Sequence, residues 1–317
     1  MTSVNSTEAA TGPGPLMMFG SLDALASLVA ERVLRAGGDA IGVGIKEPPG
    51  WPDEAGFRIR RDRRGVADAV RELRPECLIN FCVESVGRSG RLALANTAMR
   101  AAASVRVPLL IHWGSSAAYP ESSSNGRPWL ETDVFDESAD ANDLTAIDGA
   151  VREFARVHGR TKVYVFRAAT TVGPHCSSVV EDLLRTPLVS RLRRDPMMQF
   201  LHEDDAADVF WRAVQEGHGG TYNVAADGLL RLSEVCRAVA RPSAVLPAAV
   251  AWPLACFTWL LRRGPSPVRQ MRLSSGQPIV DNTRLKTHLG IRPRYTGRAA
   301  LGAARDSVLA KAGESLR

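Results

Sequence analysis

The first half of the chain alternates apolar runs of strand length with amphipathic segments, and this order constrains the fold more than any other feature. Apolar runs predict strands at Leu16-Met-Met-Phe19, 40–45, 77–83, 107–113 and 162–166. Helical periodicity occupies the intervals at 25–36, 66–73, 92–103 and 144–158. Strands and helices in this alternation form a doubly wound parallel sheet, so we predict an α/β fold with its ligand crevice at the carboxyl ends of the strands.

The regular alternation stops at Gly173-Pro174, which suggests a domain boundary. We predict a main domain over 16–173 and a small C-terminal substrate-binding lobe over 174–317, with some lobe segments returning to the main domain. Residues 1–15 are rich in Ser, Thr, Gly and Pro and lack the basic-then-apolar order of a signal peptide. We expect this segment to be a disordered tail and the protein to be cytoplasmic.

Charge and cysteine spacing argue against several classes of partner. The net charge of +6 comes from 36 arginines and 4 lysines, which are scattered along the chain. The one dense cluster, which we interpret as a solvated loop, is Arg58, Arg60, Arg61, Arg63 and Arg64. We therefore expect no nucleic-acid partner. The five cysteines lack Cys-x-x-Cys spacing, which predicts reduced thiols and no metal site.

One stretch, 243–261, runs for 19 residues without a charge, which approaches the length that crosses a bilayer. Pro247 and Pro253 interrupt it and make a membrane span a poor interpretation. We expect an apolar helix and turn that pack against the smaller lobe, with Trp252, Phe257 and Trp259 shaping a hydrophobic pocket or an oligomer contact. A peripheral membrane contact is the alternative.

Five segments occur in the order found in one enzyme family. They are Ile111-His-Trp-Gly-Ser-Ser-Ala-Ala-Tyr119, Phe166-Arg-Ala-Ala-Thr-Thr-Val-Gly-Pro174, Gln199-Phe-Leu-His-Glu-Asp-Asp205, Tyr222-Asn-Val-Ala and Asp281-Asn-Thr-Arg with Leu289-Gly-Ile-Arg-Pro. Together they resemble the extended short-chain dehydrogenases, the NAD-dependent epimerase/dehydratase branch. The resemblance covers roughly residues 16–305 and implies a Rossmann-like sheet with a small substrate lobe. It also implies a homodimer through the helices near 92–103 and 144–158.

The catalytic pair of that family, Tyr-x-x-x-Lys, does not occur in this sequence. The residues four positions after the four tyrosines are Ser123, Ala168, Ala226 and Ala299. Alignment places Thr145 at the catalytic tyrosine and Gly149 at the catalytic lysine. An unperturbed tyrosine, with a pKa of about 10, is a poor base near neutral pH without the neighbouring ammonium. The usual hydride-transfer mechanism therefore lacks its proton shuttle.

The nucleotide-binding positions also depart from the family. Alignment places Gly20 at the first fingerprint glycine, Asp23 at the second and Ala26 at the third, and Gly44 where the second strand normally offers an acid to the ribose. The second glycine lets bare backbone approach the pyrophosphate at a helix N-terminus, whereas Asp23 adds bulk and like charge there. We predict no nicotinamide cofactor. Lys46 leaves open a 2′-phosphate contact with NADP.

The remaining candidates for chemistry follow the fourth predicted strand, 107–113, and the fifth, 162–166. Ser115 or Ser116 can hydrogen-bond a substrate oxygen, although the alternative is a serine loop kept for its turn. Tyr119 is a positioning candidate, and His175 can serve as acid or base because histidine titrates near neutral pH. Asp148 is a candidate carboxylate, and a solvent-facing side chain is an equal interpretation.

These residues favour a redox-independent enzyme, a cyclase, isomerase or dehydratase, that acts on a largely apolar small molecule. The first alternative is a noncatalytic subunit or scaffold of a heteromeric biosynthetic partner. The second is an NAD(P)-dependent oxidoreductase or nucleotide-sugar epimerase with an atypical site. The excess of arginine over lysine suggests a GC-rich genome, and bacterial specialised metabolism is a reasonable setting.

Overall fold

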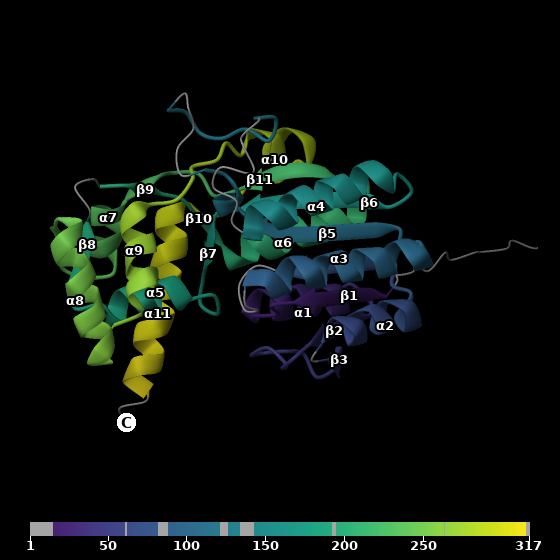
Figure 1. Cartoon of the computed structure of the whole chain (residues 1–317), viewed down its shortest axis with the longest axis horizontal. Helices are drawn as coiled ribbons and strands as arrows, with labels where there is room; N and C mark the ends of the chain where they lie inside the picture. Colours follow the sequence, from purple (N-terminus) through teal and green to yellow (C-terminus); the bar gives the residue numbers. More distant parts are fainter. Residues whose placement is uncertain are drawn as a thin grey trace, which may run out of the picture.

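The computed structural model of this protein describes residues 15–60, 62–81, 88–120, 126–133, 143–191, 195–262 and 264–314. The predicted tail lies outside these residues except for Pro15, as do Arg61 and Cys82. Figure 1 shows the chain as a sheet flanked by helices, with a smaller group of helices to one side.

A parallel sheet of seven strands forms the centre of the main domain. Its strands are β1 (Leu16–Gly20), β2 (Ala40–Gly44), β3 (Gly56–Ile59), β4 (Cys77–Phe81), β5 (Leu109–Ser115), β6 (Lys162–Ala168) and β11 (Gly220–Val224). Their spatial order is β11-β6-β5-β4-β1-β2-β3, with neighbours paired in parallel. The order reverses between β1 and β4, which is the arrangement of a doubly wound sheet, and the predicted fold class is confirmed.

Helices cover both faces of this sheet. One face carries α1 (Ala24–Arg35) and α6 (Glu203–Glu216), and the other carries α2 (Arg63–Leu73), α3 (Arg88–Val105) and α4 (Asp143–Val157). Successive strand residues point to opposite faces, so Met18 and Ile111 pack toward α1 and α6, while Met17 and Leu110 pack toward α2, α3 and α4. The strands are buried on both sides, which explains their continuous apolar runs.

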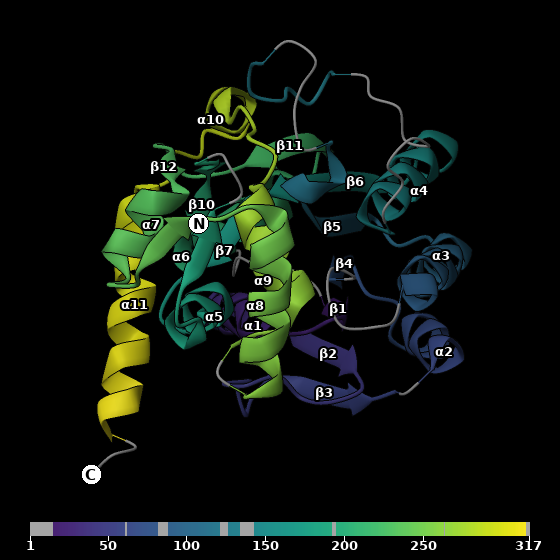
Figure 2. The same cartoon turned by 60° about the vertical axis from the view of Figure 1, so that its left-hand side comes forward.

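The lobe begins after β6 and packs around its own apolar core. Its elements are β7 (Thr170–Val172), α5 (Ser178–Arg185), β8 (Val189–Arg191), β9 (Met197–Met198), β10 (Phe200–His202), β12 (Leu230–Arg231), α7 (Leu232–Ala238), β13 (Ser243–Val245), α8 (Ala248–Leu260), α9 (Pro267–Ser275) and α11 (Gly297–Glu314). Phe200, Leu232 and Leu301 are fully buried in this core. Between lobe segments the chain returns to the sheet as α6 and β11, and α10 (Thr283–His288) lies beside β11 (Figure 2).

The arginine cluster differs from the loop predicted for it. Arg58 lies in the edge strand β3, which pairs with β2, and Arg63 and Arg64 begin α2 after the cap residue Asp62. Edge strands are half-exposed, so β3 lacks the apolar run that identifies the inner strands. Asp62 accepts a hydrogen bond from the Gly65 N–H and starts the helix inside the charged run.

The uncharged stretch forms β13 and α8, and its three large aromatic side chains are exposed on the single chain. The exposed fractions of Trp252, Phe257 and Trp259 are 48%, 59% and 55%. In the described part of the chain, no helix has both the length and the apolarity needed to cross a bilayer.

Candidate active site

The crevice at the carboxyl ends of β5 and β6 contains the predicted serine loop. β5 ends at Ser115, and a single turn of 3-10 helix, η1 (Ser116–Ala118), follows it. The Ser115 hydroxyl accepts a hydrogen bond from the Ala117 N–H at 3.2 Å, which starts this turn, and Ser116 is buried. Ser115 therefore has a structural bond, and its hydroxyl is half-buried at the edge of the crevice.

Tyr119 lies behind this turn and points into the protein. Its hydroxyl donates to Asn223 Oδ1 at 2.9 Å, lies 3.2 Å from the Leu130 carbonyl oxygen, and accepts from Arg167 Nη1 at 2.6 Å. Its ring stacks on Trp129, and the Arg167 guanidinium lies 4.5 Å from the ring centre. Burial raises the pKa of Tyr119, so the phenol stays protonated near neutral pH.

Arg167 and Asp148 form a buried ion pair between β6 and α4. Two guanidinium nitrogens of Arg167 contact the two carboxylate oxygens at 2.8 and 2.7 Å, and Arg152 adds a third contact at 2.8 Å. Burial pushes the pKa of Asp148 upward, but the hydrogen bonds and charges of Arg167 and Arg152 outweigh it, and the net pKa is lowered. Asp148 is therefore a fixed anion that bonds to arginines, which is the structural alternative to a free carboxylate in the crevice.

The positions aligned with the catalytic tyrosine and lysine serve packing. Thr145 is buried on α4, and its hydroxyl donates to the Ala118 carbonyl oxygen at 2.9 Å. Gly149 has no side chain to offer. This part of α4 therefore ties the serine loop to the helix and supplies no proton-transfer group at these positions.

The N-terminus of α1, where the pyrophosphate binds in the family, contacts protein groups instead. Asp23 caps the helix, and its carboxylate accepts from the Leu25 N–H at 3.0 Å. The Cys176 thiol, which comes from the lobe, also lies against the Leu25 N–H and close to Asp23. Burial, with the charges of Asp23 and Glu203, raises the pKa of this thiol. A diphosphate would meet two carboxylates and a packed thiol here, so these residues do not fit it.

The end of β2 lies beside apolar side chains and offers no acid. A Cβ atom at Gly44 would lie 3.7 Å from Cδ1 of Leu22 and 3.6 Å from Cζ of Phe57. These side chains occupy the surroundings of the position that offers an acid to the ribose in the family. Ala26 is fully buried at the α1 contact with the sheet. The ribose position is therefore a glycine beside apolar side chains, and Ala26 fills the helix–sheet contact that the third fingerprint glycine makes in the family.

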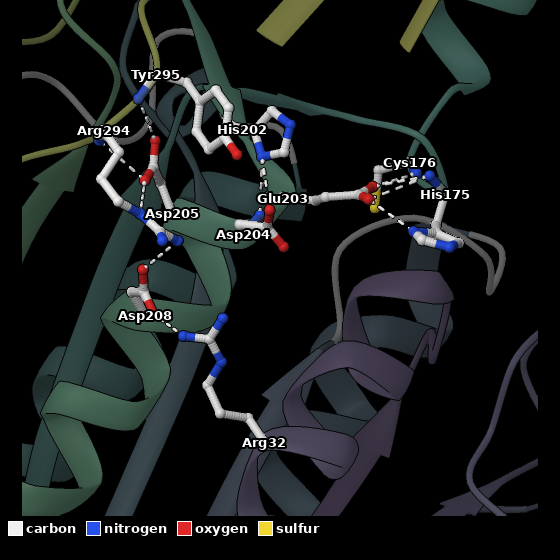
Figure 3. Close-up of polar contacts among 10 residues, drawn as sticks. All are labelled: Arg32, His175, Cys176, His202, Glu203, Asp204, Asp205, Asp208, Arg294 and Tyr295. Atoms are coloured by element: carbon white, nitrogen blue, oxygen red, sulfur yellow. Dashed lines mark hydrogen bonds and ion pairs between the residues drawn. The ribbon is translucent and has the colours of Figure 1, made fainter. Parts of the chain in front are cut away.

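His175 and Glu203 form a second polar site at the junction of the lobe with α6. Nδ1 of His175 lies 2.7 Å from Oε1 of Glu203, and the same carboxylate accepts the backbone N–H groups of His175 and Cys176 (Figure 3). Glu203 is 2% exposed, whereas the His175 side chain is 61% exposed. A Cβ at Gly173 would lie 2.5 Å from Oε2 of Glu203, so a glycine there leaves room for the carboxylate.

A groove of about 830 Å³ runs along α1 beside His175. Its walls are one face of α1, the segment that connects β2 to β3, and the His175 ring. The lining residues are Ala24, Ser27, Leu28, Glu31, Leu34, Arg35, Pro49, Gly50, Pro52, Glu54 and His175. The Ser27 hydroxyl donates to the Pro49 carbonyl oxygen at 2.9 Å and holds the connecting segment over the helix. A volume of this size accommodates a small organic molecule.

The remaining charged residues of the α6 segment join elements together. Asp205 accepts the backbone N–H groups of Arg294 and Tyr295, and Asp208 pairs with Arg32 of α1 and with Arg294 (Figure 3). His202 stacks on the Tyr295 ring with 3.8 Å between ring centres. These contacts fix α6 against α1 and the C-terminal segment, so the Glu203 carboxylate has a rigid support.

The predicted site residues thus fall into two places. Ser115, Ser116, Tyr119 and Asp148 surround the ends of β5 and β6, while His175 lines the groove by α1, and none of the other four is among the described residues that line it. Arg167 and Asn223 were not predicted as site residues, and the segment with Glu203 was identified only as part of a family motif. Arg167 lies in the Phe166–Pro174 segment, where a lone arginine inside an apolar strand was the available signal.

Comparison with known proteins agrees with this fold. A family model described as the NAD dependent epimerase/dehydratase family matches residues 58–225. This range begins inside β3, after β1, α1 and β2. Among solved structures, UDP-glucose 4-epimerase from Thermotoga maritima, with UDP-glucose, is similar with a TM-score of 0.74 and 14% identity over 94% of this chain and 99% of that one. UDP-glucose 4-epimerase from Thermus thermophilus, in complex with NAD, has a TM-score of 0.72 and 17% identity over 92% and 98%.

Curated sequences add one nearer relative. The uncharacterized protein Rv0501 of Mycobacterium tuberculosis is 32% identical over 194 residues, which are 58% of this chain and 48% of that protein. This chain thus spans about half the length of the curated relative. The likeness to the solved structures supports the fold alone, and the family model covers more than half of the sequence. This chain therefore belongs to the NAD dependent epimerase/dehydratase family.

Proposed function

We propose that this protein catalyses a redox-independent proton transfer, an isomerisation, dehydration or cyclisation, on a small and largely apolar molecule bound in the groove along α1. The observation that carries this proposal is the His175–Glu203 pair at the wall of that groove. A buried carboxylate that holds Nδ1 of an exposed imidazole orients the ring and leaves Nε2 available to exchange a proton with a bound molecule.

The redox-independent part of the proposal rests on the dinucleotide positions. Asp23 and Cys176 cover the N-terminus of α1, and Leu22 packs over the end of β2. Thr145 and Gly149 supply no phenol and no ammonium for hydride chemistry. The crevice at the ends of β5 and β6 has no proton shuttle, and we therefore assign the general base to His175, which lies outside that crevice.

The substrate class follows from the groove lining. Ala24, Leu28, Leu34, Pro49 and Pro52 give the groove apolar walls. Glu31 and Arg35 bond to each other along the α1 face, so their charges offset one another, and Glu54 is a further acidic residue of the lining. Such walls favour a ligand with a hydrophobic body and few polar groups.

The test uses the small molecules that co-purify with the protein. Mass spectrometry after denaturation identifies them, and the recovered compound is returned to the enzyme in D₂O. We expect the wild type to incorporate deuterium into this compound and His175→Gln to lose at least about tenfold in rate, as is usual for loss of a general base. His158→Gln, an exposed histidine beside Phe154, is the matched control. A nicotinamide cofactor recovered in stoichiometric amount would overturn the proposal.

A noncatalytic subunit of a biosynthetic assembly is the second candidate. It is favoured by the bonding in the crevice, because Tyr119, Asp148 and Thr145 all bond to protein groups there. Co-expression with a catalytically active homologue of the family tests it: a subunit would raise the activity of that homologue even with His175→Gln in place. The family assembly through α3 and α4, which pack side by side, would make the protein a homodimer, and analytical ultracentrifugation tests that.

A further inference from the structure

Helix α8 buries small side chains and exposes large apolar ones, which is the opposite of an ordinary surface helix. Its buried positions are the small residues Ala251 and Ala255, which lie four residues apart on one face. Its large apolar residues are exposed: 48% for Trp252, 55% for Trp259 and 76% for Leu260. A helix that serves only its own domain buries the large side chains and exposes the polar ones. The large residues of α8 therefore face something other than the lobe core.

The exposed surface extends beyond the helix. Val245 precedes it, Leu261 follows it, and Val268 of α9 is 54% exposed. The members of this apolar surface are Val245, Val250, Trp252, Phe257, Trp259, Leu260, Leu261 and Val268. Exposed apolar residues gathered on one short segment in this way indicate an interaction site.

The chain segment that forms this surface carries only basic charges. The sequence from Val235 to Val280 contains six arginines and no aspartate or glutamate. Arg262 follows the apolar run directly and is exposed. Arg269 of α9 is 54% exposed and pairs with Asp182 of α5. Asp182 offsets the charge of Arg269, and Arg262 adds a positive charge at the end of the apolar run, as in segments that bind anionic lipid headgroups.

The face opposite the apolar surface is held by polar links. Gln270 of α9 donates to the Thr258 hydroxyl at 3.2 Å and to the Pro265 carbonyl oxygen at 2.8 Å. The Ser274 hydroxyl bonds to Ser190 of β8 and so ties α9 to the lobe. Helix α8 is thus fixed with its large side chains outward, and binding requires no rearrangement of the lobe.

We propose that α8 docks this protein on an anionic lipid bilayer, with Trp252, Phe257, Trp259 and Leu260 inserted at the level of the headgroups. The helix has 13 residues, which at 1.5 Å per residue is about 20 Å and too short to cross a hydrocarbon core of about 30 Å. Tryptophan favours the bilayer interface, where its ring has one apolar and one wet side. The absence of aspartate and glutamate between Val235 and Val280, together with the exposed tryptophans and Arg262, favours an anionic lipid surface over a protein partner.

Co-sedimentation with vesicles tests this proposal on the full chain. The vesicles contain phosphatidylcholine alone or phosphatidylcholine mixed with phosphatidylglycerol. We expect the wild type to sediment with the anionic vesicles, less with the neutral ones, and less at high salt. The emission of the exposed tryptophans should shift to the blue on binding.

Three variants separate the contributions. The double substitution Trp252→Ser and Trp259→Ser should weaken anionic vesicle binding about tenfold or more, because it removes two interfacial side chains. Arg262→Gln changes charge alone and should weaken binding to anionic vesicles but not to neutral ones. Ile59→Ser, which is 58% exposed on β3, is the matched control and should bind like the wild type.

Other outcomes would overturn the proposal. Wild-type protein that stays in the supernatant with both kinds of vesicle excludes a lipid partner. Equal binding to neutral and anionic vesicles excludes the role of charge. A soluble dimer that the double tryptophan substitution dissociates, without vesicle binding by the wild type, would assign the surface to a second copy of the chain instead.

Discussion

The Glu203 carboxylate lies 2.7 Å from Nδ1 of His175 and also accepts the two backbone N–H groups that begin the lobe. One residue thus orients the candidate base and fixes the chain that carries it. The Glu203 side chain is buried and the His175 side chain is exposed. Substitutions of the two residues can therefore distinguish the structural role from the catalytic one.

Substitution of His175 should reduce turnover with little loss of stability, whereas substitution of Glu203 should reduce stability. His175→Gln should abolish most turnover while changing the free energy of unfolding by less than about 0.5 kcal/mol, because the side chain is 61% exposed. Glu203→Gln should cost about 1–3 kcal/mol, because an amide replaces the buried acceptor of several hydrogen bonds. Urea denaturation measures both. Equal destabilisation by the two substitutions would contradict separate roles.

Substitution of Arg167 should destabilise the protein strongly. Arg167→Met leaves the buried Asp148 carboxylate without its main partner, and we expect a loss of about 3–5 kcal/mol in the free energy of unfolding. The double variant Arg167→Met with Asp148→Leu should lose less than the sum of the two single variants, because it leaves no unpaired charge. Additive losses in this double-mutant cycle would show that the pair does not act as a unit.

Substitutions of Tyr119 and Ser115 should destabilise the protein to different degrees. The sequence alone predicts that Tyr119→Phe and Ser115→Ala reduce ligand affinity or turnover and leave stability nearly intact. The structure changes the expectation for Tyr119, because its loss leaves Asn223 and Arg167 each without a buried hydrogen bond, at a cost of about 1–3 kcal/mol. Ser115→Ala removes one partly exposed bond and should cost about 0.5–1.5 kcal/mol. A melting temperature that is lower for Ser115→Ala than for Tyr119→Phe would contradict this ranking.

Stability should fall in mild acid because of His112. Burial lowers the pKa of His112 to about 4, whereas the unfolded chain takes up this proton near pH 6.5. Between these values the unfolded state binds more protons, so the free energy of unfolding decreases as the pH falls from about 6.5 to about 4, by roughly 3 kcal/mol in total. Urea titrations of wild type and His112→Gln measure this contribution. An equal pH dependence in the two proteins would rule it out.

The sequence predicted the fold well because burial on both faces leaves a continuous apolar run in every inner strand. Strand β3 was missed because an edge strand carries no such run, and its Arg58 joined a cluster that resembled a loop. The inverted orientation of α8 could not be predicted, since a helix that is apolar on all sides gives no periodicity to distinguish its buried face.

The sequence predicted individual residues of the candidate site but not the contacts between them. The serine loop, Tyr119 and His175 were found because each follows a recognisable strand or motif. Their partners were not found, because Arg167, Asn223 and Glu203 lie 48, 104 and 28 residues away from the side chains that they contact. Spacing along the chain contains no information on contacts of this range, and the family motif around Glu203 suggested only a link between lobes.

Isothermal titration calorimetry with NAD⁺, NADH, NADP⁺ and NADPH tests the central claim, that this chain works without a nicotinamide cofactor, most directly. Asp23 and Cys176 occupy the helix N-terminus that would receive the pyrophosphate, and the end of β2 has Gly44 in place of an acid for the ribose. We predict no saturable heat for any of the four compounds at millimolar concentration. A dissociation constant in the low micromolar range for any of them would contradict the account and establish the protein as a nicotinamide-binding enzyme.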